Sequence, residues 1–173
     1  MLNDFRLSVE GEKLLKKLEG FRAKPYKDSA GKWTVGYGHV LVPGDGVAGP
    51  GDIISESKAT SLLEQDVEKT VKAVNSLVIN TKINQNQFDA MVIFTYNVGI
   101  GAFSKSTILK SVNAGNYEEA SKTFQLWCKV HTPQGMFVEI AGLRNRRLAE
   151  EKLFDTPVTT VQNQPSTQAV ATA

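Results

Sequence analysis

Hydrophobic and polar positions follow helical spacing near the start of the chain. Over Val9–Leu18 the lysines lie on other faces than the apolar residues, which predicts an amphipathic helix. Ser8 stands where an N-cap residue is expected and Gly20 where the helix should stop, but Gly11 replaces the Glu or Gln that would complete a capping box. The apolar face of this helix is formed by Leu14, Leu15 and Leu18.

A longer helix is predicted from Ser55 to about Val78, and the pattern stays helical after it. Asn84 with Gln87, and Asn116 with Glu119, each pair an N-cap residue with a partner three positions later, as at a helix start. The apolar stripe of the long helix steps by three or four positions through Leu63, Val67, Val71, Val74 and Val78.

Strand-like patterns are confined to the segment between these two helices. Trp33–Tyr37 mixes β-branched and aromatic residues with glycine after the turn-like run Asp28–Gly31, so Phe21–Leu41 predicts a β-hairpin. The next segment, Pro43–Asp52, has four Gly and two Pro in ten residues and predicts a loop. With a last helix expected from about Glu139 to Phe154, the order of elements indicates an α+β fold rather than alternating βαβ units.

Composition narrows the class of protein. The 173 residues carry 20 Lys or Arg against 18 Asp or Glu, and a net charge of +2 is too small to indicate nucleic-acid binding. The single cysteine, Cys128, excludes an intrachain disulfide, and the two distant histidines make a structural zinc site a poor expectation. No apolar run has the roughly 18–20 residues of a membrane span, and we expect no secretory signal at the start. The uncharged stretch Thr156–Ala173 is predicted to be a flexible tail.

Three polar residues near the start are candidates for chemistry. Glu19 ends the first helix, where the helix dipole disfavours a charged carboxylate, so it could serve as a general acid. Asp28 opens the turn, and Thr34 lies in the strand-like run. Each also has a plain structural reading: a surface Glu, a turn-forming Asp and a strand Thr.

Three further residues are candidates for ion pairs. Arg146 lies on a partly apolar face of the last helix, where a guanidinium either finds a carboxylate or extends toward solvent. His39 follows the hairpin and Asp66 lies beside the buried stripe of the long helix, so a His–Asp pair could pin the hairpin to that helix; the alternative is a solvated histidine.

The order and spacing of these residues resemble a known family. Glu19, eight residues, Asp28, five residues and Thr34, followed by Gly36-Tyr37-Gly38-His39, resembles the signature of the tailed-phage lysozymes (endolysins) of glycoside hydrolase family 24. The resemblance covers roughly residues 8–155. Three more stretches match in the family's order: Gln65–Val67, Tyr96–Ser104 and Gly142–Arg147.

The resemblance implies a two-lobed, lysozyme-like α+β fold with its site between the lobes. One catalytic domain would span residues 1–155, with a small lobe over about 8–55, a connecting helix over about 56–78 and a helical lobe over about 79–155. The tail, 156–173, lies outside the resemblance.

The resemblance also implies the activity and the roles of residues. The expected reaction is hydrolysis of the β-1,4 bond between N-acetylmuramic acid and N-acetylglucosamine in peptidoglycan. Glu19 would be the general acid with Arg146 as its ion-pair partner, Asp28 the opposing carboxylate, and Thr34 a holder of the attacking water. His39 and Asp66 would form a structural salt bridge. The saccharide would be bound by Val40, Tyr96, Asn97 and Ser106.

The residue types suit this reaction. Cleaving an acetal needs one protonated and one ionised carboxyl. A helix end and a polar turn are two different environments, which can keep one carboxyl protonated and the other ionised. No metal or cofactor is expected. Carboxyls about 5–5.5 Å apart indicate retention and about 6.5–9.5 Å inversion, so the sequence leaves the stereochemistry open.

The expected biological role is host cell lysis. The enzyme would accumulate in the host cytoplasm as a monomer, reach the wall after a holin opens the membrane, and neither insert in the membrane nor bind nucleic acid. Many relatives instead use an N-terminal signal-anchor helix. The alternatives are a virion-associated wall hydrolase acting at entry, a lysozyme-like wall-binding domain without activity, and a chitinase of similar fold.

Overall fold

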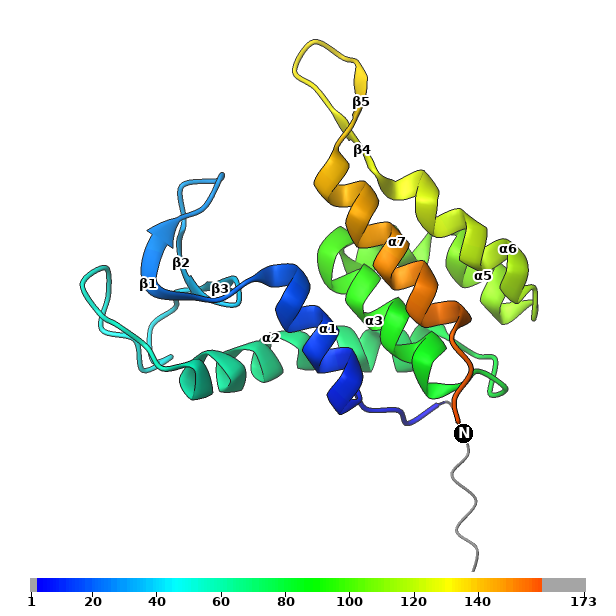
Figure 1. Ribbon diagram of the computed structural model, residues 1–173, viewed down its shortest axis with the longest axis horizontal. Helices are drawn as coiled ribbons and strands as arrows, with labels where there is room; N and C mark the ends of the chain where they lie inside the picture. Colours follow the sequence, from blue (N-terminus) through cyan, green and yellow to red (C-terminus); the bar gives the residue numbers. More distant parts are fainter. Residues whose placement is uncertain (1–2, 160–173) are drawn as a thin grey trace, which may run out of the picture.

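A computed structural model describes residues 3–159 of the protein, and Figure 1 shows a small three-stranded part beside a larger helical part. The predicted tail from residue 160 onward lies outside the described residues, and the division of the chain into residues 1–155 and a tail stays a prediction. In chain order the elements are α1 (Val9–Glu19), β1 (Arg22–Lys27), β2 (Trp33–Gly36), β3 (His39–Val40), α2 (Glu56–Leu77), α3 (Gln85–Val98), α4 (Ile100–Ser104), α5 (Thr107–Asn113), α6 (Tyr117–Thr123), the 3-10 turn η1 (Phe124–Trp127), β4 (Lys129–His131), β5 (Phe137–Glu139) and α7 (Ala141–Asp155).

Helix α3 forms the centre of the helical part. All its residues from Gln87 to Thr95 are buried, as expected for a helix that is covered on every side. Its start is the predicted capping box: Asn84 Oδ1 accepts from the Gln87 N–H at 2.9 Å, and Gln87 Oε1 accepts from the Asn84 N–H at 2.9 Å. The matching prediction at Asn116 is correct for the position, because Asn116 is the N-cap residue of α6, but its backbone (φ −87°, ψ 71°) is not extended and its side chain makes no capping bond.

Helix α1 packs on α3 through a polar contact at its first turn. Ser8 caps α1 as predicted, accepting from the Gly11 N–H at 3.0 Å. The fully buried Asp89 of α3 accepts from the Ser8 N–H at 3.1 Å and from the Ser8 hydroxyl. A Cβ at Gly11 would lie 2.7 Å from the Asp89 carboxylate. Glycine, in place of the Glu or Gln of a capping box, therefore permits the close approach of α1 to α3.

The sheet β1-β2-β3 is antiparallel and rests on the start of α2. Gly36 of β2 has a positive φ of 66°, and a Cβ there would lie 2.9 Å from Ala59 Cβ on α2, so glycine sets the approach of sheet to helix. Ser55 caps α2 by accepting from the Lys58 N–H at 3.1 Å. The predicted stripe is buried against the core, with Val78 following the last residue of α2.

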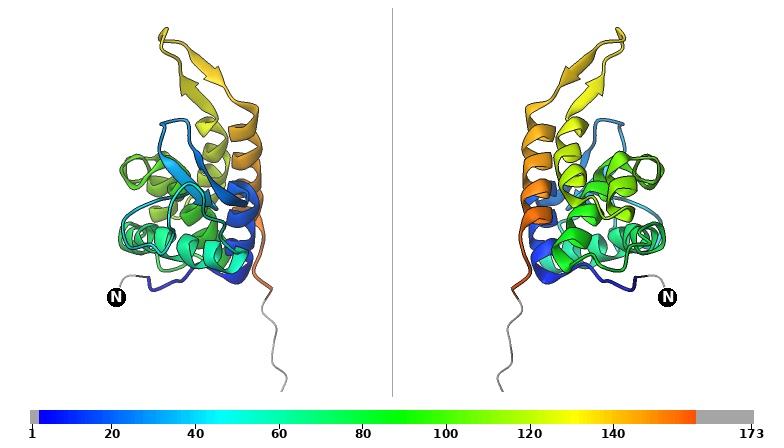
Figure 2. Two further views of the ribbon diagram at one scale, coloured as in Figure 1. Left: turned by 90° about the vertical axis from the view of Figure 1, so that its left-hand side faces the viewer. Right: turned by 90° about the vertical axis from the view of Figure 1, so that its right-hand side faces the viewer.

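The prediction that the chain is all-helical after residue 79 is wrong at β4 and β5. These strands form an antiparallel hairpin, and Figure 2 shows that it projects beyond the helical body. Three-residue strands are too short to reveal a period-two pattern. Because Glu139 pairs with Lys129 in this hairpin, α7 begins at Ala141 and not at about Glu139 as predicted.

Helix α7 is joined to α3 by buried charges. Arg147 and Glu150 are both fully buried, with Arg147 Nε 2.8 Å from Glu150 Oε2. Arg147 also donates to Asn97 Oδ1 at 2.7 Å and lies over the Phe94 ring, while Arg146 Nε donates to Glu150 Oε1 at 3.2 Å. Burial raises the pKa of Glu150 to about 7, although both arginines lower it.

We predict that Gly11→Ala destabilises the protein by about 1–3 kcal/mol, because the new methyl group would collide with the Asp89 carboxylate. The matched control is Gly142→Ala, in the first turn of α7, where a Cβ meets no atom within 4 Å. The control should be neutral or stabilise the protein by up to about 1 kcal/mol. Urea unfolding of both variants measures the difference, and equal stabilities would contradict the packing argument.

We also predict a pH dependence from Glu150. A carboxyl with a raised pKa in the folded state binds its proton more tightly there, so its contribution to stability is complete below pH 4.5 and is lost as pH rises through 7. We compare the free energy of unfolding of the parent with that of Glu150→Gln. The advantage of the parent should fall by up to about 3 kcal/mol between pH 4.5 and pH 7. The measurement is urea unfolding at several pH values; a difference that does not vary with pH would exclude Glu150 as the source.

Candidate active site

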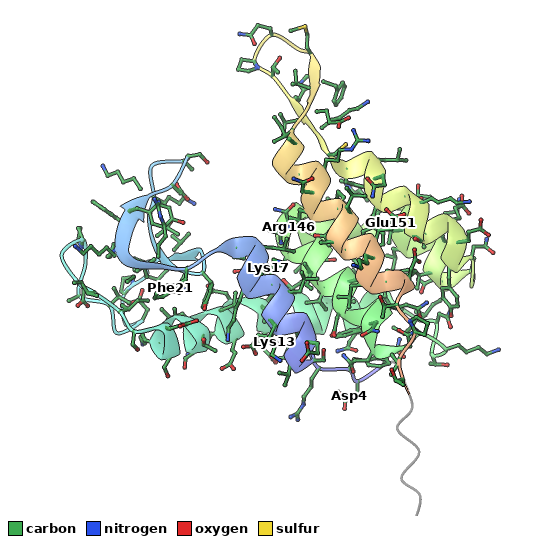
Figure 3. The ribbon with its side chains drawn as sticks, viewed as in Figure 1. Asp4, Lys13, Lys17, Phe21, Arg146 and Glu151 are labelled. Atoms are coloured by element: carbon green, nitrogen blue, oxygen red, sulfur yellow. The ribbon has the colours of Figure 1, made fainter. Side chains whose placement is uncertain are left out.

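Glu19 and Arg146 meet between the end of α1 and the first half of α7. Arg146 Nη1 donates to Glu19 Oε1 at 2.7 Å, and their side chains are 9% and 20% exposed. Figure 3 shows Arg146 directed from α7 toward the end of α1. Arg146 is held in turn by Glu150 and by the Ile93 carbonyl at 3.3 Å. The other oxygen of the Glu19 carboxylate, Oε2, faces Gly38, where a Cβ would lie 3.7 Å away.

Asp28 and Thr34 come from the first hairpin. Asp28 Oδ1 accepts from the Ala30 N–H at 2.8 Å and the Lys32 N–H at 2.9 Å, so the turn fixes the carboxylate's orientation. Thr34 is buried in β2, and its hydroxyl donates to the Lys32 carbonyl at 3.2 Å. Both side chains are thus oriented by the backbone of the same turn.

His39 lies between two carboxylates. Its Nδ1 is 2.8 Å from Asp66 Oδ2 on α2, which is the contact that the sequence suggested. Its Nε2 is 3.3 Å from Asp45 Oδ2, a partner that the sequence did not suggest. Asp45 belongs to the glycine- and proline-rich loop, so this histidine joins the sheet, the long helix and the loop. Hydrogen bonds from the Val42 and Val47 N–H groups and the His39 contact lower the pKa of Asp45.

Two residues of α3 face the same region. Burial raises the pKa of the Tyr96 hydroxyl, the nearby charges of Asp66 and Glu19 raise it further, and Arg146 opposes them. Tyr96 therefore lies among the charged candidates. Asn97 is exposed, and its amide oxygen accepts the bond from the buried Arg147 described above.

The remaining predicted saccharide-binding residues differ in their surroundings. Val40 is partly exposed and lines a hollow of about 630 Å³ between the sheet and the glycine-rich loop, together with Trp33 and Val47. Ser106 is buried instead, and its hydroxyl caps α5 by accepting from the Leu109 N–H at 3.1 Å. The structure therefore gives Ser106 a capping contact, and its role toward a saccharide stays a prediction.

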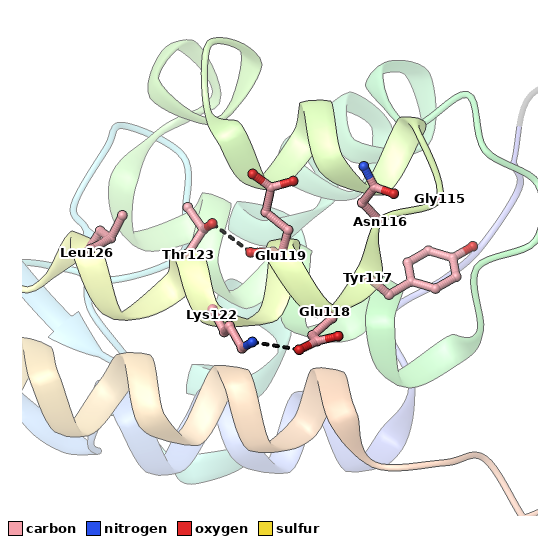
Figure 4. Close-up of a pocket in the computed structure, with 8 residues that line it drawn as sticks. All are labelled: Gly115, Asn116, Tyr117, Glu118, Glu119, Lys122, Thr123 and Leu126. Carbon is pink, nitrogen blue, oxygen red and sulfur yellow. Dashed lines mark hydrogen bonds and ion pairs between the residues drawn. The ribbon is translucent and has the colours of Figure 1, made fainter.

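A larger hollow, of about 850 Å³, lies over α6 and away from this region. Figure 4 shows its wall, with an ion pair between Lys122 and Glu118 at 2.6 Å. None of the candidate residues lines it. Within residues 3–159, no three His, Cys, Asp or Glu side chains group as metal ligands, and every helix is too short or too polar to cross a membrane.

Sequence reasoning missed part of the charge network. Asp45 carries no signal beyond that of a turn residue in a loop. Arg147 and Glu150 do have a signal, the i, i+3 spacing of opposite charges on one helix, but this spacing is more typical of exposed pairs. Only burial distinguishes this pair from an exposed ion pair. Burial on that face of α7 depends on where α3 lies, which the local sequence does not show.

Comparison with known proteins identifies the family of this chain. The family model described as phage lysozyme matches residues 16–150. The endolysin of Acyrthosiphon pisum secondary endosymbiont phage 1 is 37% identical over 149 residues, which cover 86% of this chain and 97% of that protein. A SAR-endolysin of bacteriophage PS119 is 36% identical over 110 residues, covering 64% of this chain and 63% of that protein.

Solved structures give the same result. The endolysin from Escherichia coli O157:H7 phage FAHEc1 superposes with a TM-score of 0.81 at 39% identity, over 89% of this chain and 96% of that one. The muramidase domain of SpmX from Asticaccaulis excentricus also has a TM-score of 0.81, at 37% identity over 89% of this chain and 100% of that one. These matches confirm the two-lobed, lysozyme-like α+β fold. The chain belongs to the phage lysozyme family.

Proposed function

We propose that this protein is an endolysin that hydrolyses the β-1,4 bond between N-acetylmuramic acid and N-acetylglucosamine in peptidoglycan, and so lyses the host cell. The observation that carries the proposal is the ion pair of Glu19 with Arg146, in a chain where a turn separately orients the Asp28 carboxylate. This arrangement presents two carboxyls in different environments, as glycoside hydrolysis requires.

Glu19 is the general acid of the proposed reaction. Arg146 occupies Oε1, so Oε2 is the oxygen that can carry a proton and give it to the glycosidic oxygen of the leaving sugar. Arg146 also fixes the side chain in one orientation, because it is held by Glu150 and the Ile93 carbonyl and cannot follow Glu19 outward.

Asp28 and Thr34 act on the other side of the sugar. The Asp28 carboxylate stabilises the positive charge that develops at the anomeric carbon as the bond breaks. Asp28 and the Thr34 hydroxyl hold the attacking water between them. The bonds to Oδ1 from Ala30 and Lys32 support this role, since they fix the carboxylate before the substrate arrives.

His39, Asp66 and Asp45 support the site without taking part in the chemistry. Their contacts tie the glycine-rich loop and β3 to α2, which positions Val40 beside the saccharide. In this proposal Tyr96 and Asn97 of α3 also contact the saccharide. Neither metal nor cofactor enters this scheme.

The proposal extends to the route by which the enzyme reaches the wall. It accumulates in the host cytoplasm as a monomer, and a holin opens the membrane for it. The single, buried Cys128 supports folding in a reducing compartment, because the protein needs no disulfide.

We expect Glu19→Gln to reduce the clearing of chloroform-treated Gram-negative cells by at least about a hundredfold, because an amide is too weakly acidic to protonate the leaving oxygen. The matched control is Glu10→Gln on the same helix, whose only described partner is the exposed Lys13. Intact cells expressing the parent should lyse only when chloroform or a holin opens the membrane. Clearing by Glu19→Gln would refute the catalytic assignment, and spontaneous lysis of intact cells would refute the holin route.

We expect Asp66→Asn to lower the free energy of unfolding by about 1–3 kcal/mol, because it removes a charged partner of a buried histidine. The kcat near neutral pH should stay within about twofold of the parent. Glu68→Gln, an exposed position on the same helix, is the control and should change neither quantity. Parent-like stability of Asp66→Asn would count against the supporting role.

A further inference from the structure

The β4–β5 hairpin stands apart from the core. Each of its six strand residues is exposed, and Figures 1 and 2 show the hairpin extending outward from the start of α7. A two-stranded hairpin without a packed face is only marginally stable in water. Exposed apolar side chains at such a place are typical of a binding surface.

The two faces of this hairpin differ in chemistry. Cross-strand partners share a face, so the register places Lys129, His131, Phe137 and Glu139 on one face, which we call the aromatic face. Val130 and Val138 form the other. Phe137 is 72% exposed, and the His131 ring meets it at 4.8 Å with an interplanar angle of 62°. The aromatic face thus combines an exposed ring with hydrogen-bonding groups.

The hairpin is continuous with the site. Its base is closed by the Ile140 N–H donating to the Cys128 carbonyl at 2.9 Å, and α7 follows at once. Arg144 of α7 pairs with Glu139 at 2.5 Å. Arg146, the partner of Glu19, lies five residues after Ala141, about 8 Å along the helix. The base of the hairpin is therefore near Arg146, and we expect a polymer cleaved beside Glu19 to extend past it.

We propose that the aromatic face of the β4–β5 hairpin binds the glycan strand of peptidoglycan outside the bond being cleaved, which rests on the function proposed above. Sugar rings offer apolar C–H faces to an aromatic ring and hydroxyls to charged groups, and this face supplies both. A lipid bilayer fits less well, since Lys129 and Glu139 would have to enter the hydrocarbon beside Phe137. A second copy fits less well, since three-residue strands offer a short edge for pairing.

The first test measures binding without catalysis. Purified sacculi are sedimented with the Glu19→Gln protein, alone and combined with Phe137→Thr, which keeps a strand-forming residue. The second substitution should weaken binding about two- to tenfold. Val138→Thr, on the opposite face of the same strand, is the control and should leave binding unchanged. Thermal melting checks that each variant is folded. Equal affinity with and without Phe137→Thr would overturn the proposal.

The second test uses the active enzyme. With Glu19 intact, Phe137→Thr should raise KM for polymeric peptidoglycan about two- to tenfold and leave kcat unchanged. Hydrolysis of a soluble tetrasaccharide of alternating N-acetylglucosamine and N-acetylmuramic acid should not change. A lower kcat on the tetrasaccharide would overturn the proposal in favour of a structural effect on the site. Sedimentation velocity could instead show that the parent is a dimer and that Phe137→Thr is a monomer, with KM unaltered. That result would overturn the proposal, because the aromatic face would then bind a second copy of the chain.

The two proposals can fail separately. A parent enzyme that cleaves neither substrate would refute the proposed function, whereas sedimentation with sacculi would still report on the aromatic face. Normal cleavage together with binding that ignores Phe137 would refute only the role of the hairpin.

Discussion

The guanidinium of Arg146 is the contact on which the geometry of this site depends. It binds Glu19 at the end of α1, while Glu150 of α7 and the Ile93 carbonyl of α3 hold it from behind. Without Glu150 the buried guanidinium would keep only Glu19 and the Ile93 carbonyl, so Glu150 helps to hold Arg146 where it can bind Glu19. Glu150 in turn requires Arg147, which reaches Asn97. The position of one carboxylate at the end of α1 is therefore determined by a chain of charges through α7 into α3.

Local signals made much of the fold predictable. Ser8 and the Asn84–Gln87 pair cap helices because hydrogen bonding between near neighbours suffices to satisfy a helix start. The valine stripe of α2 was readable for a similar reason, since 22 residues give the helical period room to repeat. The strands β4 and β5 offer three residues each, and their pairing depends on a turn between them, so periodicity could not reveal them.

Spacing along the chain that resembles a family signature identified Glu19, Asp28 and Thr34 as candidates, and their catalytic roles stay predictions. The contacts around the candidate residues were less predictable from the sequence. The contact of His39 with Asp45 depends on how a loop with four glycines turns back, and no local propensity encodes that. The close approach at Gly11 is similar: the sequence shows an absent capping residue, and only the packed helices show that Asp89 needs the space. Long-range packing decides both.

The β4–β5 hairpin has a consequence for how such enzymes diversify. Its two strands leave and rejoin the body at neighbouring points, Cys128 and Ile140, and none of its strand residues contributes to the core. Insertions or replacements between those points would leave the folded body and its charge network unchanged. The hairpin can therefore change in length and sequence with little effect on the stability of the body.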